Sequence, residues 1–440
     1  MCCFYLAFAK AEFQPIPILL KCILAALINL MSQVQRFTLL IFCISCFSIT
    51  AQKYSYGAEI ALGQSLPSNK EFPDRALQSQ LWFHVSQQKD NPEIKWHQRL
   101  QFPETGISLG YSNYGNNEIL GSSYSILPFI KFKSFNNNRL HTYLGLGASY
   151  FTQKYDAVNN SLNHAISTDV TWTFRALLNY QLLKTEKWNY STGLSVVHHS
   201  NGHTSLPNNG FNSFLVSINA TYLPKKVVLH PESTTSSHIK TSYLSIYQGI
   251  GFQVFSDLPY FNRKKEVYTV GVEYGKTYNR TWKLGIGAFY RFYQHYYDYI
   301  NDGEYLVREN QRFSDMKGKA FSNATNIGVY LKGELLLNYI GIELAIGANL
   351  YKPAYKIDYS INEGWDNPPR EFPDGWQFAD LDTRYKMRHL INSRVGINYY
   401  PLGTNDFKNH NFYIGAHINA NYGQADFTEL RLGYVYEFIR

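Results

Sequence analysis

The chain has 440 residues, of which 16% are Phe, Tyr or Trp and only 17% are charged, and its formal net charge is +8. An aromatic bias of this size is typical of β-barrels that cross a membrane, because aromatic rings gather at the lipid–water boundary. Downstream of Ala51 the sequence contains no apolar run of about 18 residues, which excludes a bundle of spanning helices. A chain that crosses a membrane would therefore have to do so as a barrel.

The first 52 residues predict an export signal behind an upstream extension. From Met31, the basic Arg36 precedes the apolar run FTLLIFCISCFSI, and Thr50-Ala51-Gln52 supplies a small-residue cleavage site. Residues 1–30 would then precede the true start; the alternative is that PILLKCILAALINLM forms a second apolar element. All five cysteines lie in this region: Cys2, Cys3, Cys22, Cys43 and Cys46. After cleavage, the chain would have no thiol for a disulfide, a metal site or a nucleophile.

Beyond Gln52, apolar and polar residues alternate in segments of about ten residues, separated by clusters of Asn, Gly, Asp and Pro. The even-numbered residues of 170–180 (VTWTFRALLNY) and of 411–422 (NFYIGAHINANY) form apolar faces. A soluble β-sandwich also alternates, but here aromatic residues stand at both ends of the apolar face, as in a lipid-facing band. The pattern predicts an all-β chain that forms an antiparallel transmembrane barrel in the outer membrane.

The strands fall into two sets of about eight, separated by the polar, proline-containing segment PKKVVLHPESTTSSHIK. We therefore expect two tandem eight-stranded barrels, over 53–224 and 241–440, joined by a linker over 225–240. The role of the second barrel is not indicated. One barrel of about sixteen strands would fit the same pattern and is the alternative. The long stretches at 152–168, 301–324 and 353–383 should lie outside the cell, opposite the short periplasmic turns.

One segment, VVHHSNGHTSLPNNGFNSF (196–214), concentrates polar residues that are able to carry chemistry. The strands on either side of its loop have apolar faces, and pairing position 198 with 212 also pairs 196 with 214 and 194 with 216. This register places His198, Ser200 and Asn212 together on the outside of the barrel, at the height of the outer leaflet. Polar groups on a lipid-facing surface are costly, which favours a functional role over chance.

These residue types suit the cleavage of an ester. A His and a Ser two residues apart on one strand face can share a hydrogen bond, so that the imidazole accepts the hydroxyl proton during attack on a carbonyl. Asn212 would hold the other ring nitrogen. Asn201, Asn208 and the backbone amides around Gly202 would stabilise the oxyanion. The alternative for His198 and Ser200 is a polar rim above the lipid band.

A metal or cofactor is not expected at this segment. His199 and His203 are four residues apart, but they lie in a loop and lack the glutamate of the H-E-x-x-H pattern. In the predicted register His199 points to the barrel lumen, which favours a structural role. In the second half, Glu343 and Glu429 should also face the lumen and pair with Arg or Lys.

H-x-S-N-G at 198–202, followed by P-N-x-G at 207–210 before a final strand, is similar to the active-site signature of the lipid A 3-O-deacylase (PagL) family, also described as acyloxyacyl hydrolase-like. The resemblance covers about the first half of the exported chain, with a weaker echo in TGISLGYSNYG (105–115). It implies an eight-stranded barrel with a Ser-His-acid triad open to the outer leaflet. His198 would be the base, Ser200 the nucleophile, and Asn201, Gly202 and Asn208 would surround the oxyanion.

The chain departs from that family at position 212, where the typical acid, Glu, is replaced by Asn. An amide orients imidazole but does not stabilise imidazolium by charge. The predicted function is removal of an acyl chain from lipid A by a serine carboxylic-ester hydrolase that needs no cofactor. Lipopolysaccharide in the outer leaflet would be the partner, since export argues against nucleic acid as the reason for the positive charge. The alternative is a non-enzymatic outer-membrane barrel that acts as a pore, a binding protein or a structural protein.

Overall fold

The computed structural model describes residues 54–69, 72–88, 95–135, 137–223, 239–256, 261–363, 381–406 and 408–439. The predicted extension and export signal (1–52) lie outside the described residues. So does the predicted linker (225–240), except for its last two positions. None of the helices among the described residues is both long enough and apolar enough to cross a membrane.

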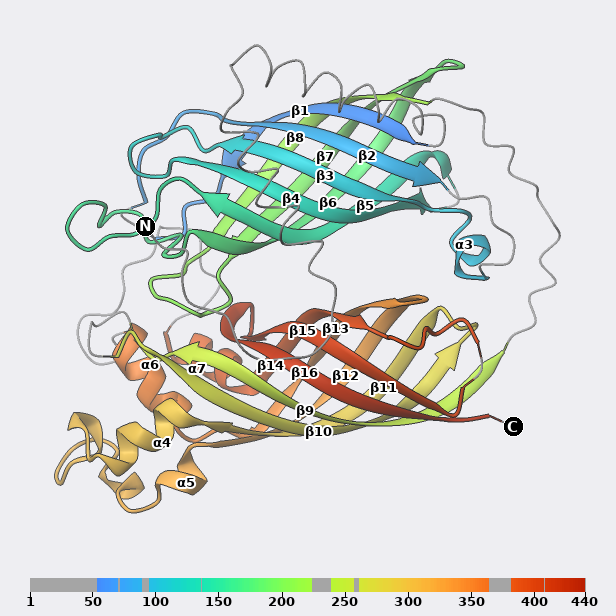
Figure 1. The fold of residues 1–440 in the computed structure, drawn as a ribbon. Helices are drawn as coiled ribbons and strands as arrows, with labels where there is room; N and C mark the ends of the chain where they lie inside the picture. The colour runs from blue at the N-terminus through green and yellow to red at the C-terminus, as the bar shows by residue number, and fades with distance from the viewer. Residues whose placement is uncertain are drawn as a thin grey trace, which may run out of the picture. The chain divides into compact units, whose positions relative to one another are not determined.

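The first half of the chain forms a closed antiparallel barrel of eight strands (Figure 1). The strands are β1 (Ser55–Ser65), β2 (Gln78–Gln88), β3 (Glu104–Asn113), β4 (Ser122–Ser134), β5 (Asn137–Phe151), β6 (Val170–Lys184), β7 (Trp188–Ser200) and β8 (Phe211–Tyr222), with the short helix α3 (Lys95–Arg99) between β2 and β3. β8 pairs back onto β1, from Tyr222 with Tyr56 to Ser213 with Ser65. Because the sheet closes at this point, the alternative of one sixteen-stranded barrel is wrong.

The second half forms another closed antiparallel barrel of eight strands. Its strands are β9 (Lys240–Val254), β10 (Lys264–Tyr278), β11 (Trp282–Tyr293), β12 (Thr325–Leu337), β13 (Ile340–Tyr351), β14 (Ile391–Tyr399), β15 (His410–Asn421) and β16 (Gln424–Phe438), and β16 pairs with β9. The connections of this barrel carry the helices α4 (Gln294–Asn301), α5 (Ala320–Asn323), α6 (Tyr355–Glu363) and α7 (Leu381–Leu390), with 3-10 turns η2 (Tyr305–Val307) and η3 (Ser314–Met316). Figure 1 shows these helices gathered at one end of the strands.

The outer surfaces of both barrels are apolar, as the alternating pattern predicts. In β7 and β8 the outward side chains Leu194 and Ile218 are 64% and 69% exposed, whereas the serines between the outward positions are buried. An aromatic group closes one end of this surface, where the Trp188 ring lies 5.3 Å from Tyr222 and 6.2 Å from Tyr190. An exposed apolar band with an aromatic border is the surface that a lipid bilayer covers. The fold is therefore that of a transmembrane β-barrel.

Side chains fill the lumen of each barrel, as expected where only eight strands enclose it. In the second barrel, Lys332 is buried and its Nζ lies 2.7 Å from Glu273 and 3.2 Å from Glu343. Arg394 donates to Glu343 at 2.6 Å, and Arg431 donates to Glu429 at 2.8 Å. The predicted pairing of Glu343 and Glu429 with basic residues inside the barrel is confirmed. The described part of this lumen is thus a packed ionic core.

Candidate active site

The loop between β7 and β8 brings together the polar residues singled out in the sequence. His198 pairs with Asn212, Val196 with Phe214, and Leu194 with Val216, which confirms the predicted register. Since alternate residues of a strand share a face, His198 and Asn212 continue the outward apolar columns of β7 and β8. The site therefore lies at the ends of two lipid-facing strands, on the side where the longer connections emerge.

His198 is held in one orientation by Asn212. The Nδ1 atom of His198 lies 2.8 Å from Oδ1 of Asn212. An amide oxygen only accepts hydrogen bonds, so Nδ1 carries the proton and donates it to Asn212. The other ring nitrogen, Nε2, is then unprotonated and able to accept a proton. This is the tautomer that a general base needs.

Ser200 accepts two hydrogen bonds from the loop that follows it. The backbone N–H of Gly202 lies 3.1 Å from the Ser200 Oγ, and Nδ2 of Asn208 lies 3.0 Å from the same atom. The side chain is only 5% exposed. Among the described contacts there is no hydrogen bond between His198 and Ser200, so the bond expected from their spacing is not formed in this structure. Two donors converge on the hydroxyl oxygen, and its own proton is available to a base.

Asn201 makes contacts that shape the turn. Its Nδ2 donates to the backbone oxygen of Ser205 at 2.9 Å and to Oγ of Ser167 at 3.1 Å. Its Oδ1 accepts the backbone N–H groups of His203 and Thr204 at 2.9 and 3.2 Å. The side-chain donors of Asn201 therefore point into the loop rather than at Ser200. Its backbone N–H has a further effect, because it donates to Oδ1 of Asn208 at 3.1 Å and so aims Nδ2 of Asn208 towards Ser200.

The connection between β5 and β6 forms hydrogen bonds with the loop between β7 and β8 and so supports the candidate site. Ser167 belongs to this connection, and its neighbours His164 and Ala165 accept the backbone N–H groups of Asn209 and Gly210 at 3.1 and 3.0 Å. Sequence reasoning did not find Ser167, because it lies 34 positions before Asn201 and only the folded loop brings the two together. No motif in the sequence marks it.

Gly210 sits against the imidazole. Its φ is +72°, and a Cβ atom built there would lie 3.2 Å from Cε1 of His198 and 2.9 Å from the backbone oxygen of His199. Both the backbone conformation and the close approach therefore require glycine at this position. The glycine of the P-N-x-G pattern thus leaves the space in which the His198 ring lies.

His199 faces the lumen, as predicted, and its contacts are structural. Its Nδ1 lies 2.9 Å from the Thr173 hydroxyl and its Nε2 lies 3.1 Å from the Tyr114 hydroxyl. Its ring also meets Phe151 edge to face at 5.2 Å. This buried cluster fixes the end of β7 from the inside, so that His198 and Ser200 are presented outwards.

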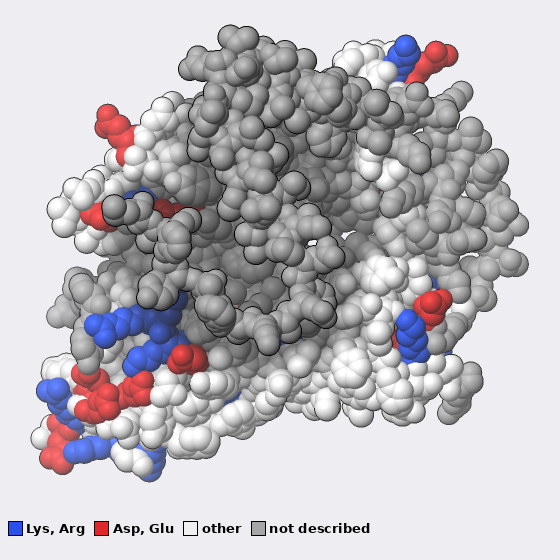
Figure 2. Space-filling view, viewed as in Figure 1, with Lys and Arg blue, Asp and Glu red and all other residues white. Residues whose placement is uncertain are grey.

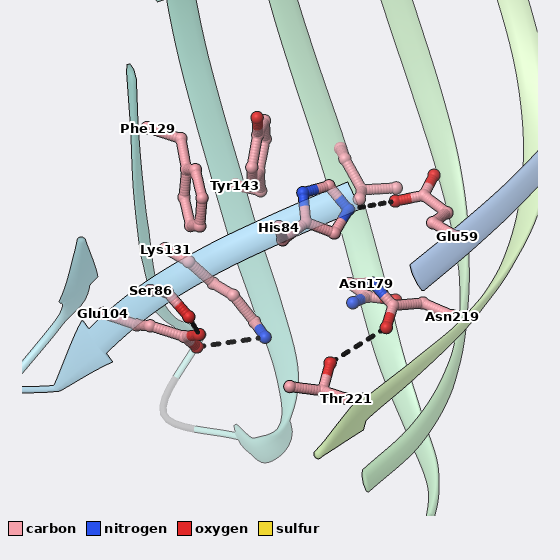
Figure 3. Close-up of a pocket in the computed structure, with 11 residues that line it drawn as sticks. Glu59, His84, Ser86, Glu104, Phe129, Lys131, Tyr143, Asn179, Asn219 and Thr221 are labelled. Atoms are coloured by element: carbon pink, nitrogen blue, oxygen red, sulfur yellow. Dashed lines mark hydrogen bonds and ion pairs between the residues drawn. The ribbon is translucent and has the colours of Figure 1, made fainter. Parts of the chain in front are cut away.

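A second group of titratable side chains lies in the lumen of the first barrel, around a cavity of about 20 Å³ (Figure 3). His84 bridges Ser108 at 2.7 Å and Glu59 at 3.3 Å, and Glu59 also accepts a hydrogen bond from Arg175. Ser108 is fully buried, and its hydroxyl also lies 2.8 Å from that of Tyr143. A cavity of this volume holds about one water molecule, so the cluster offers no space for a lipid substrate. Among the described residues, no group of three His, Cys, Asp or Glu side chains has the arrangement of a metal site.

Comparison with known proteins supports the interpretation of the first barrel. Residues 83–221 match the family model described as Lipid A 3-O-deacylase (PagL). No curated protein matches the chain. Among solved structures, the outer membrane enzyme PagL is 15% identical, with a TM-score of 0.27 over 37% of this chain and 97% of that one. A triple mutant of the Rhodopseudomonas blastica porin is 10% identical, with a TM-score of 0.17 over 88% of this chain and 99% of that one. The match over 83–221 includes His198 and Ser200 and confirms the resemblance of the first barrel to the lipid A 3-O-deacylase (PagL) family.

Proposed function

We propose that the first barrel hydrolyses an acyl ester of lipid A, with Ser200 as the nucleophile and His198 as the general base. The observation that carries this proposal is the convergence of two donors on the Ser200 Oγ, beside an imidazole whose basic nitrogen is unprotonated. If His198 and Ser200 only formed a polar rim above the lipid band, the structure would need neither the fixed tautomer of His198 nor N–H groups directed at the Ser200 Oγ. The outward position of the site suits a substrate whose acyl chains are already in the membrane.

The reaction follows from these positions. As Oγ of Ser200 forms a bond to the ester carbonyl carbon, its proton passes to Nε2 of His198, and the carbonyl electrons move onto the oxygen. When the tetrahedral intermediate collapses, the sugar alkoxide leaves and takes the proton from His198. Water then attacks the acyl-serine with His198 again as the base, which releases a fatty acid and restores the Ser200 hydroxyl.

Gly202 and Asn208 are proposed to stabilise the oxyanion. Their N–H groups lie 3.0–3.1 Å from the Ser200 Oγ in the free protein. Small shifts would bring both donors to the carbonyl oxygen once Oγ is bonded to the carbon. Donors that are aimed before reaction cost little reorganisation, and removing one such donor typically costs about 10²–10³ in kcat. Asn201 is proposed to act as a positioning residue, because it holds the turn that aims both donors.

His198 must also rotate slightly or be drawn towards Ser200 on substrate binding, because no hydrogen bond joins the two side chains in the described contacts. Catalytic hydrogen bonds are often long or unaligned before substrate binds, so this geometry is compatible with the role proposed for His198. Asn212 keeps the ring in the productive tautomer throughout the reaction. Since it is neutral, we expect a slower enzyme than one with a carboxylate at position 212.

The competing proposal is a non-enzymatic barrel with a vestigial site. Conduction is disfavoured for the second barrel by its packed ionic lumen, where Lys332, Glu343 and Arg394 are all less than 5% exposed. The decisive test is the acyl-chain content of lipid A from cells that carry the full chain or its Ser200→Ala variant, measured by mass spectrometry. The parent should remove an acyl chain and the variant should not.

A matched control is Ser195→Ala, a serine on the lumen face of the same strand whose Oγ has no hydrogen-bond partner among the described residues. This variant should deacylate like the parent. His198→Ala should be as inactive as Ser200→Ala, since a nucleophile and its base act as a unit. Unchanged lipid A in cells with the folded parent would leave the non-enzymatic barrel as the better proposal.

A further inference from the structure

An aromatic row continues the lipid-facing surface of the second barrel beyond the end of β11. The outward side chains of β11 form an alternating series that ends at Phe292, after Trp282, Leu284 and Ile286. The Phe292 ring contacts Phe321 of α5, with ring centroids 5.3 Å apart, and Tyr297 of α4, at 5.7 Å. The apolar column of the strand is thus extended onto two helices of the connection between β11 and β12.

Phe321 is an exposed aromatic residue in the β11–β12 connection, where other apolar side chains are buried. Its side chain is 64% exposed, whereas Met316 and Ala320, from the same connection, are buried in the core formed by the helices. The connection therefore has an inner face that packs and an outer face that carries a phenylalanine. Exposing a large ring to water is unfavourable, and its contact with Phe292 places it next to the surface that lipid covers.

Two lysines accompany this ring. The segment from Met316 to Ser322 (MKGKAFS) contains Lys317 and Lys319. Asp315 precedes this segment, and its carboxylate lies 3.8 Å from Nζ of Lys356. Lys317 and Lys319 are both exposed, and Lys317 makes only an exposed ion pair with Glu309, at 3.3 Å. Figure 2 shows basic and acidic side chains together at the end of the second barrel where α4 and α5 lie, next to a largely uncharged surface along the strands. An aromatic ring with adjacent lysines at the edge of an apolar band matches the chemistry of an anionic membrane interface.

We propose that α5 and the residues before it form a lipid-contact element at the outer-leaflet interface. Phe321 inserts at the level of the head groups, and Lys317 and Lys319 bind phosphate groups of the surrounding lipids. The occupant is the lipid of the leaflet itself, because the ring is continuous with the lipid-facing strand and the lysines that precede it in the sequence are exposed. This role belongs to the second barrel and does not depend on ester hydrolysis by the first.

The depth of α5 tests the first part of the proposal. In the full chain, with the five N-terminal cysteines replaced by serine, Ser322→Cys is labelled with an environment-sensitive fluorophore and the protein is reconstituted in phosphatidylcholine vesicles. Lipids brominated near the head group should quench this label, and adding Phe321→Ser should remove the quenching. A label at Tyr305→Cys is the control, because Tyr305 is 61% exposed in the same connection. That label should stay unquenched. If the labels at positions 322 and 305 both emit as water-exposed fluorophores and neither is quenched, Phe321 does not insert into the lipid.

The charge of the lipid tests the second part. Phosphatidylglycerol is titrated into micelles of the Ser322-labelled chain, and the midpoint of the fluorescence response is compared between variants. Lys317→Gln and Lys319→Gln should each raise the midpoint about fivefold, the effect typical of one lysine at an anionic surface. Lys276→Gln, an exposed lysine near the opposite end of β10, is the matched control and should leave the midpoint unchanged. If all three variants behave alike, the phosphate contact is wrong. Heat-modifiable migration on gels establishes that each variant is folded.

Discussion

At the scale of single residues, Asn212 and Gly210 determine what His198 is able to do. Asn212 fixes the proton on Nδ1 through its 2.8 Å hydrogen bond, and Gly210 leaves the space that the ring occupies. Neither residue touches Ser200 in the described contacts. Their effect on the proposed reaction is therefore exerted through the imidazole.

Asn212→Glu should raise turnover. A carboxylate at this position would stabilise the positive charge that develops on His198 during attack, which the amide does not. In a site that excludes water the difference should be about 1–3 kcal/mol, or roughly 10- to 100-fold in rate. Initial rates on purified lipid A in mixed micelles would measure it. Asn212→Ala should be slower than the parent; equal rates for these two would show that Asn212 does not orient the ring.

Gly210→Ala should lower activity while the barrel still forms. The added Cβ would be strained at a φ of +72° and would press on the His198 ring and the His199 carbonyl. Displacement of a catalytic ring by a fraction of an ångström is expected to cost more in kcat than in KM. Gly423→Ala is a matched control, because that glycine also has a positive φ but has nothing within 4 Å of its Cβ position. A normal kcat for Gly210→Ala would argue against this tight fit.

At the scale of elements, the period-two pattern was sufficient to predict the strand register around the candidate site. It predicted the pairing of β7 with β8 residue by residue, since a slip of one residue would turn every apolar side chain into the lumen. The contacts that complete the turn were not predictable from periodicity. Ser167 reaches Asn201 only because the β5–β6 connection folds back over the loop. Likewise, the helices in the β11–β12 and β13–β14 connections were not predicted, because the sequences of these connections show no regular alternation of apolar and polar residues.

The helix α6 should be more stable in acid than at neutral pH. Asp358 accepts hydrogen bonds from Tyr296 at 2.8 Å and Asn362 at 3.1 Å, but burial raises its pKa from the ordinary value of 3.8 to about 6. The folded state therefore binds the proton more tightly than the unfolded chain does. This stabilisation is complete below pH 3.8 and is lost as the pH rises through about 6.

Asp358→Asn should remove that dependence, because an amide accepts the Tyr296 hydrogen bond without becoming charged. Above pH 6 the variant should resist proteolysis within α6 better than the parent, and in acid the two should be similar. Comparing parent and variant at each pH cancels the pH dependence of the protease itself. Equal cleavage at neutral pH would mean that the buried charge does not destabilise the helix.

At the scale of the whole molecule, each half of the chain closes its own sheet. The first barrel pairs β8 with β1 and buries the Glu59–Arg175 ion pair in its own lumen. A truncated chain that ends near residue 226 should therefore fold alone in detergent micelles, migrate in a heat-modifiable way, and keep the deacylase activity proposed for the first barrel. A truncated chain that never folds, while the full chain does, would show that the second barrel is needed for assembly.

Because the proposed site faces outwards, its substrate would reach it by diffusion in two dimensions. A cleft in a soluble enzyme samples substrate from a volume, whereas a site on the lipid-facing surface of β7 and β8 samples it by lateral diffusion within one leaflet. The rate should then follow the mole fraction of lipid A in the leaflet and be insensitive to the bulk amount of vesicles. Dilution with inert lipid should slow turnover, and the released fatty acid should remain in the leaflet beside the enzyme.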